Sequence, residues 1–297
     1  MGDSEQARFV SAKLDFVRRI EIFSFFCGIF DYNLIVRIAV YKNSLMFGLT
    51  QVTNYRGDIW LNIVNKLITL SGVIFLWSII GKISSDVAET RLLISYFLIA
   101  NGVQGLVDAE SLRFSKAINR EVKLGGLSAH LLRPVNTVMF VFANFLGTRG
   151  VSMLTTILLI VIGFLFLKSV TVLQIVLFLV CLALAFIVAF IFNMFIGSLS
   201  FWSPESHHFQ NVMSHVLRVF SGVLIPISFF SGTAREVLIR SPFPSLGYLP
   251  AMVIQSKTIT SEMMTVLFST TIWCVVLLPT CFWFWRKGLR RYEAIGI

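Results

Sequence analysis

The feature that most constrains this chain is residues 169–204, a stretch without a single Asp, Glu, Lys or Arg. A helix needs about 20 apolar residues to cross the roughly 30 Å hydrocarbon core of a bilayer, so this stretch is long enough to span one. Of all 297 residues, 56% are hydrophobic and 13% are charged, against about 25% charged in ordinary soluble domains. A soluble domain of this size could not bury so much apolar surface. The sequence therefore excludes a soluble enzyme and a disordered chain.

Six apolar segments are expected to cross the membrane as helices, because lipid offers no partners to free backbone N–H and C=O groups. They comprise residues 59–80, 92–107, 151–167, 170–199, 212–230 and 263–285. The expected fold class is an all-α polytopic membrane protein with six transmembrane helices. The chain is expected to divide into two parts. Residues 1–57 form a cytoplasmic tail with an interfacial helix, and residues 58–297 form the transmembrane domain.

The distribution of Lys and Arg predicts the orientation, since cytoplasmic connections of membrane proteins are enriched in both. Of the 25 such residues, seven precede residue 58, six lie in the connection 109–150 and four follow residue 285. We therefore expect a multi-pass protein of the cytoplasmic (inner) membrane with both termini in the cytoplasm. This bias and contact with membrane lipids account for the net charge of +10, and no nucleic-acid partner is expected.

Two further segments are predicted to be neither spans nor simple loops. Apolar residues recur every three or four positions in residues 31–55, which predicts an amphipathic helix lying in the inner interface. The alternative is a helix that faces the core of a small cytoplasmic domain. Residues 231–261, extracellular by the charge distribution, are apolar but contain Pro242, Pro244 and Pro250, which forbid one continuous helix. Short re-entrant helices are expected there.

Catalytic and metal-binding patterns are missing from the sequence. It contains no GxxxxGK[ST] phosphate-binding loop, no GxSxG and no HExxH. The four cysteines include no CxxC pair, and no histidine stands at metal-ligand spacing beside them. We therefore expect no catalytic, cofactor-binding or metal-binding residue on this chain.

Polar residues within the predicted spans are candidates for a transport pathway, because intramembrane charge is costly and often functional. The candidates are Asn62, Lys66, Asn101, Gln104 and Arg218. Two other interpretations stay open: the charged side chains extend to the interface, and the amides form hydrogen bonds between helices.

The connection between the second and third segments carries a family resemblance. Its portion 125–136, GGLSAHLLRPVN, resembles a cytoplasmic signature of the permeases of type-2 ATP-binding-cassette exporters. Shorter patches resemble the same family in the same order: Tyr55-Arg56, FWSPE at 201–205, SGVLIPISFF at 221–230, SPFPSLGYLPAMV at 241–253 and WRKGLRRYEAIG at 285–296. One departure is Ser231, where the family tends to have proline, which leaves the shape of the outer turn open.

The resemblance implies a permease subunit that pairs with a second copy or a related permease, while a separate ATPase subunit binds ATP and Mg²⁺. The substrate is unidentified; amphipathic, drug-like or lipid-like cargo would suit the aromatic composition. The residues that the resemblance and the local pattern assign to ATPase coupling are Arg120, Gly125, Gly126, Leu127, Leu131, Leu132, Arg133 and Pro134. Gly125 and Gly126 are expected to allow a backbone turn that residues with a Cβ resist. Between these glycines and the proline, the leucines are expected to form an exposed apolar docking patch. The alternatives are an ion-coupled secondary transporter and a non-catalytic structural membrane subunit.

Overall fold

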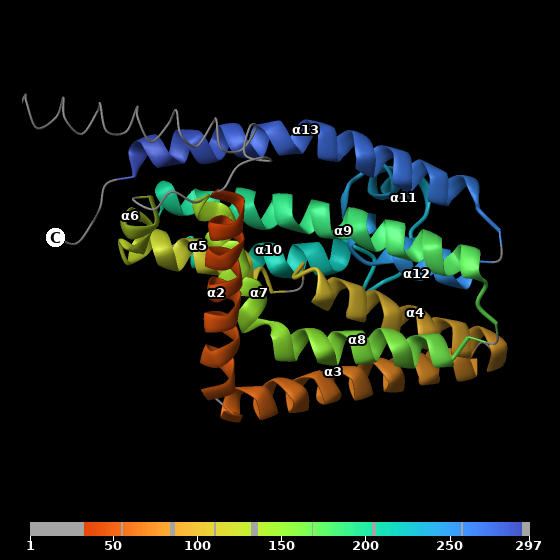
Figure 1. The fold of residues 1–297 in the computed structure, drawn as a ribbon. Helices are drawn as coiled ribbons and strands as arrows, with labels where there is room; N and C mark the ends of the chain where they lie inside the picture. Colours follow the sequence, from red (N-terminus) through yellow and green to blue (C-terminus); the bar gives the residue numbers. More distant parts are fainter. Residues whose placement is uncertain are drawn as a thin grey trace, which may run out of the picture.

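The computed structural model describes residues 33–54, 56–83, 87–109, 111–131, 136–167, 169–203, 206–256 and 258–292. Every regular element in these ranges is a helix, which confirms the all-α prediction for the described part of the chain. The long helices α3 (Arg56–Ile83), α4 (Val87–Leu106), α8 (Gly150–Leu165), α9 (Val172–Ser198) and α13 (Ser261–Arg291) run side by side. Helix α2 (Asn33–Asn54) runs across their ends (Figure 1).

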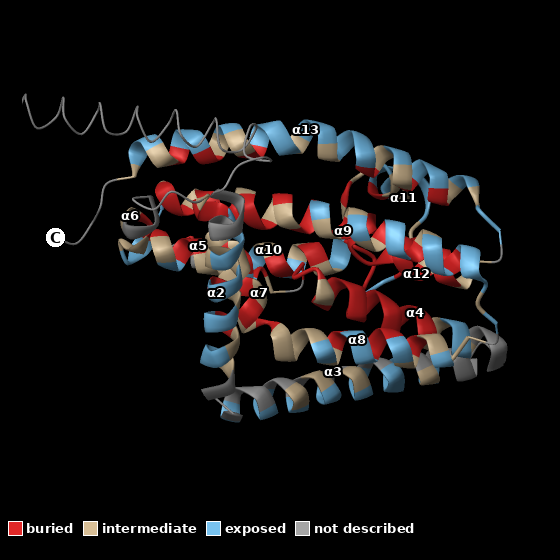
Figure 2. Ribbon diagram, viewed as in Figure 1, coloured by how far each residue is buried: buried red, intermediate tan, exposed pale blue. Residues whose placement is uncertain are grey.

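The long helices bury one side and expose apolar residues on the other. Figure 2 shows buried residues along α4 and the facing side of α9, whereas α13 is exposed over most of its outer side. Phe268 and Val275 of α13 are 71% and 69% exposed, and Val172 of α9 is 78% exposed. Apolar residues in water are unfavourable, so outer faces of this kind fit contact with lipid.

Length and composition identify two single helices that could cross a membrane, Val172–Phe201 and Ser261–Arg291. A third span is possible if α7 (Thr137–Thr148) and α8 are counted together, although they are bent by 66° at Arg149. These findings, which concern the described residues, support a multi-pass membrane protein. The number of six spans stays a prediction.

The predicted fifth segment, residues 212–230, is not one helix. Helix α10 (His207–Phe220) begins before that segment and ends ten residues short of its end. Gly222 has a φ of +77°, which only glycine adopts easily, and the Tyr96 hydroxyl donates a hydrogen bond of 2.7 Å to its carbonyl. Pro226, which lacks an N–H, precedes the short helix η2 (Ile227–Phe229). The hydropathy of the sequence therefore identified residues 212–230 as apolar, but it did not reveal the turn at Gly222 that ends the helix.

Short helices are present between residues 231 and 261, as predicted from the prolines. They are α11 (Gly232–Ile239), η3 (Phe243–Leu246) and α12 (Tyr248–Gln255). Helix α12 packs against α4 and α9, and the Tyr248 hydroxyl donates a hydrogen bond of 2.7 Å to Glu262 of α13. Whether these helices re-enter a membrane stays a prediction.

Helix α2 confirms the helix predicted for residues 31–55, and it packs closely on α7. Gly48 and Gly147 face each other's helix, and a Cβ on Gly147 would overlap the backbone of Leu45. The Ser44 hydroxyl also donates a hydrogen bond of 3.1 Å to the Phe140 carbonyl. Both helices can approach this closely because they lack side chains at the contact. The interfacial location of α2 stays a prediction.

We expect Gly147→Ala to weaken the packing of α2 on α7 and to lower the free energy of unfolding by about 1–3 kcal/mol, as overpacking does elsewhere. Chemical unfolding in detergent would measure this change. Gly72→Ala is the control, because a Cβ at Gly72 of α3 meets no atom within 4 Å. Equal stability of the two variants would contradict the close contact.

Candidate functional site

Helix α5 (Arg113–Lys123) is the amphipathic part of the 109–150 connection. It buries Phe114, Ile118 and Val122, at spacings of four, against α7 and α9. Arg113, Arg120 and Lys123 are exposed on the other side. One helix therefore joins the apolar core of the chain to a basic surface.

A glycine turn connects α5 to the short helix α6 (Gly126–Leu131). Gly125 has a φ of +74°, so the predicted requirement for glycine is confirmed at this position. At Gly126 the constraint is different: an added Cβ would meet the carboxylate end of Glu121, which is a flexible side chain.

The predicted apolar docking patch needs correction at Leu127. Its side chain is 1% exposed and belongs to the core cluster of Phe114, Ile118 and Trp285, so it is not available to a partner. The exposed leucine is instead Leu124, at 72%, directly before the glycines. Sequence reasoning missed it, although Leu124 stands two residues beyond Val122 and therefore off the buried face of α5.

Several predicted coupling residues cannot be placed on that surface. Leu131 is the last residue of α6, but its side chain is outside the described part, and so are Leu132, Arg133 and Pro134. Arg120 is described and exposed.

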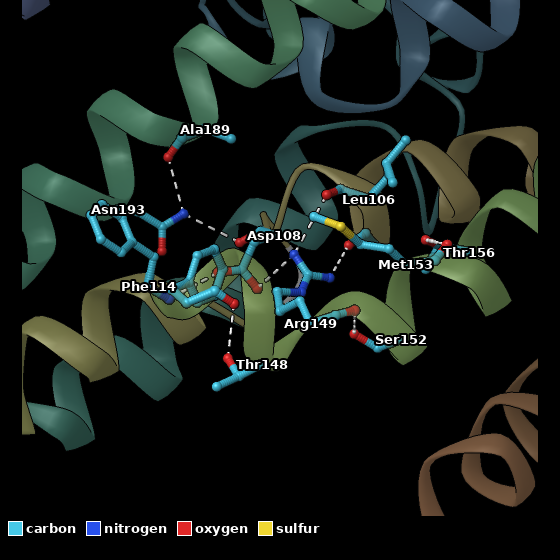
Figure 3. A network of polar contacts seen from close by, with 12 residues as sticks. Leu106, Asp108, Phe114, Thr148, Arg149, Ser152, Met153, Thr156, Ala189 and Asn193 are labelled. Carbon is cyan, nitrogen blue, oxygen red and sulfur yellow. Dashed lines mark hydrogen bonds and ion pairs between the residues drawn. The ribbon is translucent and has the colours of Figure 1, made fainter. Parts of the chain in front are cut away.

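Asp108 and Arg149 form a buried ion pair in the interior of the helical bundle (Figure 3). Asp108 follows α4, Arg149 lies at the break between α7 and α8, and the charged atoms Oδ1 and Nη1 are 3.4 Å apart. Their side chains are only 3% and 4% exposed. Arg149 also donates hydrogen bonds to the carbonyls of Gly105 and Leu106, at the end of α4. The cation thus supplies donors to carbonyls in the last turn of α4, where Gly105 also accepts a hydrogen bond from the Asp108 N–H.

The Asp108 carboxylate stabilises the start of α5. Its Oδ2 accepts a hydrogen bond of 3.0 Å from the Phe114 N–H, in the first turn of that helix. Burial raises the pKa of the Asp108 carboxyl, while the Arg149 guanidinium and the Phe114 N–H act in the opposite direction. The turn before α5 contains two non-glycine residues with positive φ, Asp108 at 61° and Leu112 at 48°. Such backbone persists where the surroundings fix it, as the ion pair does here.

Asn193 connects this pair to α9. Its Nδ2 donates to the Asp108 carbonyl at 3.3 Å and to the Ala189 carbonyl at 3.0 Å, and its Oδ1 accepts from the Ser115 N–H at 3.1 Å. Sequence reasoning treated Asp108 and Arg149 as ordinary charges of a connection. The only signal in the sequence for this network was Asn193, an amide within the uncharged stretch 169–204. Its position in the sequence does not show which residues it contacts.

A second set of contacts joins α5 to α10. The Asn119 Nδ2 donates to the hydroxyls of Ser200 and Ser206, at 3.0 and 2.5 Å, and Gln210 of α10 donates to the Ser115 carbonyl at 3.4 Å. Helix α5 is therefore bonded to the end of α4, to α9 and to the start of α10.

The candidate pathway residues fall into different environments. Asn101 donates to the Phe97 carbonyl at 2.8 Å, and Gln104 donates to the Ser221 hydroxyl at 2.8 Å, so both buried amides have partners within the chain. Lys66 and Arg218 are half-buried, while the side chain of Asn62 is outside the described part. A pathway role for these residues stays a prediction.

Comparison with known proteins identifies the family. The profile described as ABC-2 family transporter protein matches residues 63–296, which is most of the chain. No curated protein matches the sequence. The match includes α5, α6 and the helices bonded to them. The chain therefore belongs to the ABC-2 family of transporter proteins, as a membrane-embedded permease subunit of an ABC transporter.

Proposed function

We propose that this permease belongs to an exporter in which α5, the Gly125 turn and α6 receive movement from a separate ATPase subunit. The observation that carries this proposal is the position of α5. Its exposed side is basic and ends at the exposed Leu124, while its buried side is bonded to α4, α9 and α10. A partner that displaced α5 would act on three helices at once.

These bonds support a route by which movement of the ATPase would reach the spans. ATP and Mg²⁺ bind to the partner, whose closure shifts α5 relative to the membrane. Asp108 and Asn193 fix the start of α5, so the shift is transferred to the end of α4 and to α9 rather than absorbed by a loop. A second copy of the chain, or a related permease, supplies the other half of the pathway. The substrate is an unidentified compound of amphipathic, drug-like or lipid-like chemistry.

Purification of the chain from its native membrane tests this function. We expect an ATPase subunit with a phosphate-binding loop to co-purify, and the reconstituted complex to transport only with hydrolysable ATP. Transport driven by an ion gradient without that subunit would instead establish a secondary transporter. A chain that neither binds an ATPase nor supports transport would be a structural subunit.

The orientation is tested with epitope tags. We expect tags at Met1, beside Lys123 and at Ile297 to be protected in intact cells, and a tag beside Thr258 to be labelled. The reason is the concentration of Lys and Arg in both tails and in the 109–150 connection. Labelling of the Lys123 tag in intact cells would contradict this orientation.

A further inference from the structure

A cleft lies between α2, α5 and α7 and continues to α3 and α8. The part lined by Arg113, Lys116 and Thr155, here called the inner part, has a volume of about 660 Å³. The part lined by Val40, Phe47 and Phe140, here called the outer part, has a volume of about 510 Å³. Gln51, Ala117, Arg120 and Asn144 line both parts, so the two parts adjoin. The cleft is large enough for the polar head of a lipid, and both parts are open to the surroundings.

The inner part of the cleft has a basic wall. Arg113, Lys116 and Arg120 line it from successive turns of α5, and no Asp or Glu is among the described residues that line it. Burial lowers the pKa of Lys116; Asp108 opposes this effect and Arg113 adds to it. A bound anion would relieve both the repulsion between Arg113 and Lys116 and part of the cost of burying a cation. The outer part includes one acidic side chain, Glu121.

The wall opposite α5 carries both apolar and polar side chains. Val52 of α2, Ile63 of α3 and Val151 of α8 are apolar, whereas Gln51, Thr148, Ser152 and Thr155 are polar. A ligand with an anionic group alone would leave the apolar side chains of this wall uncontacted. A ligand that combines an anionic head with hydrocarbon would contact both walls.

The position of the cleft favours a lipid over a soluble anion. Helix α2 runs across the ends of α3 and α8, and its Phe47, 65% exposed, lines the outer part of the cleft. Basic pockets between helices at the cytoplasmic side of membrane proteins bind the heads of anionic lipids. We propose that this cleft binds the phosphate head of an anionic phospholipid of the inner leaflet, with the acyl chains directed along α3 and α8. The cytoplasmic position of the cleft and the choice of leaflet rest on the orientation proposed above.

Native mass spectrometry of the full chain, purified in detergent without an ATPase, tests the site. The probes are phosphatidylglycerol and phosphatidylcholine with identical chains. We expect preferential binding of phosphatidylglycerol, and Lys116→Gln with Arg120→Gln to weaken it by about 30-fold, because each basic residue near an anionic lipid contributes roughly a factor of five. Lys123→Gln is the matched control: Lys123 is exposed on the same helix but does not line the cleft.

Three outcomes would overturn the proposal. They are equal binding of the two lipids, equal loss in the Lys123 control, and unchanged binding in the double variant. Competition distinguishes the source of the phosphate: displacement of the lipid by millimolar inorganic phosphate would assign the cleft to a soluble anion. An unchanged unfolding midpoint in neutral detergent shows that the double variant is folded. Because the assay contains no ATPase and measures no transport, failure of the coupling proposal would leave its result intact.

Discussion

Arg149→Gln is expected to lower the free energy of unfolding by about 3–5 kcal/mol, the usual cost of removing one partner from a buried ion pair. The Asp108 carboxylate would remain buried without its ion-pair partner, the Leu106 carbonyl would lose its side-chain donor, and the Gly105 carbonyl would keep only the Asp108 N–H. Chemical unfolding in detergent would measure the loss. We expect transport to fail as well, because the pair joins α4 and α5 to the break between α7 and α8.

Asp108→Asn in the same chain is the control for the charge. Asparagine tolerates the φ of 61° at this position and can still accept a hydrogen bond from the Phe114 N–H. The double variant should therefore recover about 1–3 kcal/mol of the loss, within the range of coupling energies between contacting residues. If Arg149→Gln lowered the free energy of unfolding by less than about 1 kcal/mol, the pair would contribute no more than a solvent-exposed ion pair does, and this prediction would be wrong.

The pH dependence gives a second readout for Arg149→Gln. Burial raises the folded-state pKa of Asp108 above its unfolded value, and the variant removes the guanidinium that opposes this rise. A group with a raised folded-state pKa contributes stability below its unfolded pKa, about 4 for Asp, and loses it as the pH rises through the folded-state pKa. The deficit of the single variant should therefore shrink on acidification, and Asp108→Asn should abolish that dependence.

The helices that the sequence predicted well are those whose pattern is local. The uncharged stretch at 170–199 corresponds to α9, and the spacing of apolar residues in 31–55 corresponds to α2. Gly125 was predictable because few residues other than glycine adopt a positive φ. Each of these signals is contained within one turn or one helix.

The features that the sequence did not predict depend on distant contacts. Nothing in the segment 212–230 shows that the Tyr96 hydroxyl, 126 positions away from Gly222, binds the turn that follows α10. Leu127 and Leu124 have the same hydropathy, and only the packing of α6 against α5 and α7 decides which of them is buried. The partnership of Asp108 and Arg149 likewise joins residues on different helices. Patterns of composition identify helices but not the side chains that connect them.

Leu124→Asp is expected to reduce ATPase retention by about 10- to 150-fold, because burying a leucine at an interface contributes roughly 1.5–3 kcal/mol. Leu124 is 72% exposed in the chain alone, so the substitution should leave the stability of the permease nearly unchanged. Leu131→Asp with Leu132→Asp is expected to weaken the same association and abolish transport. Retention is measured on the purified complex in detergent, together with the rate of stimulated ATP hydrolysis.

Leu127→Ala is the matched comparison, since it lies three residues from Leu124 and is buried in the core. We expect it to lower the free energy of unfolding by about 2–5 kcal/mol, as buried leucines do elsewhere. Its folded fraction should still retain the ATPase, because the Leu124 side chain is unaltered. The two variants therefore separate loss of docking from loss of stability. Normal retention and normal stimulated hydrolysis in both aspartate variants would refute the assignment of this turn to ATPase coupling.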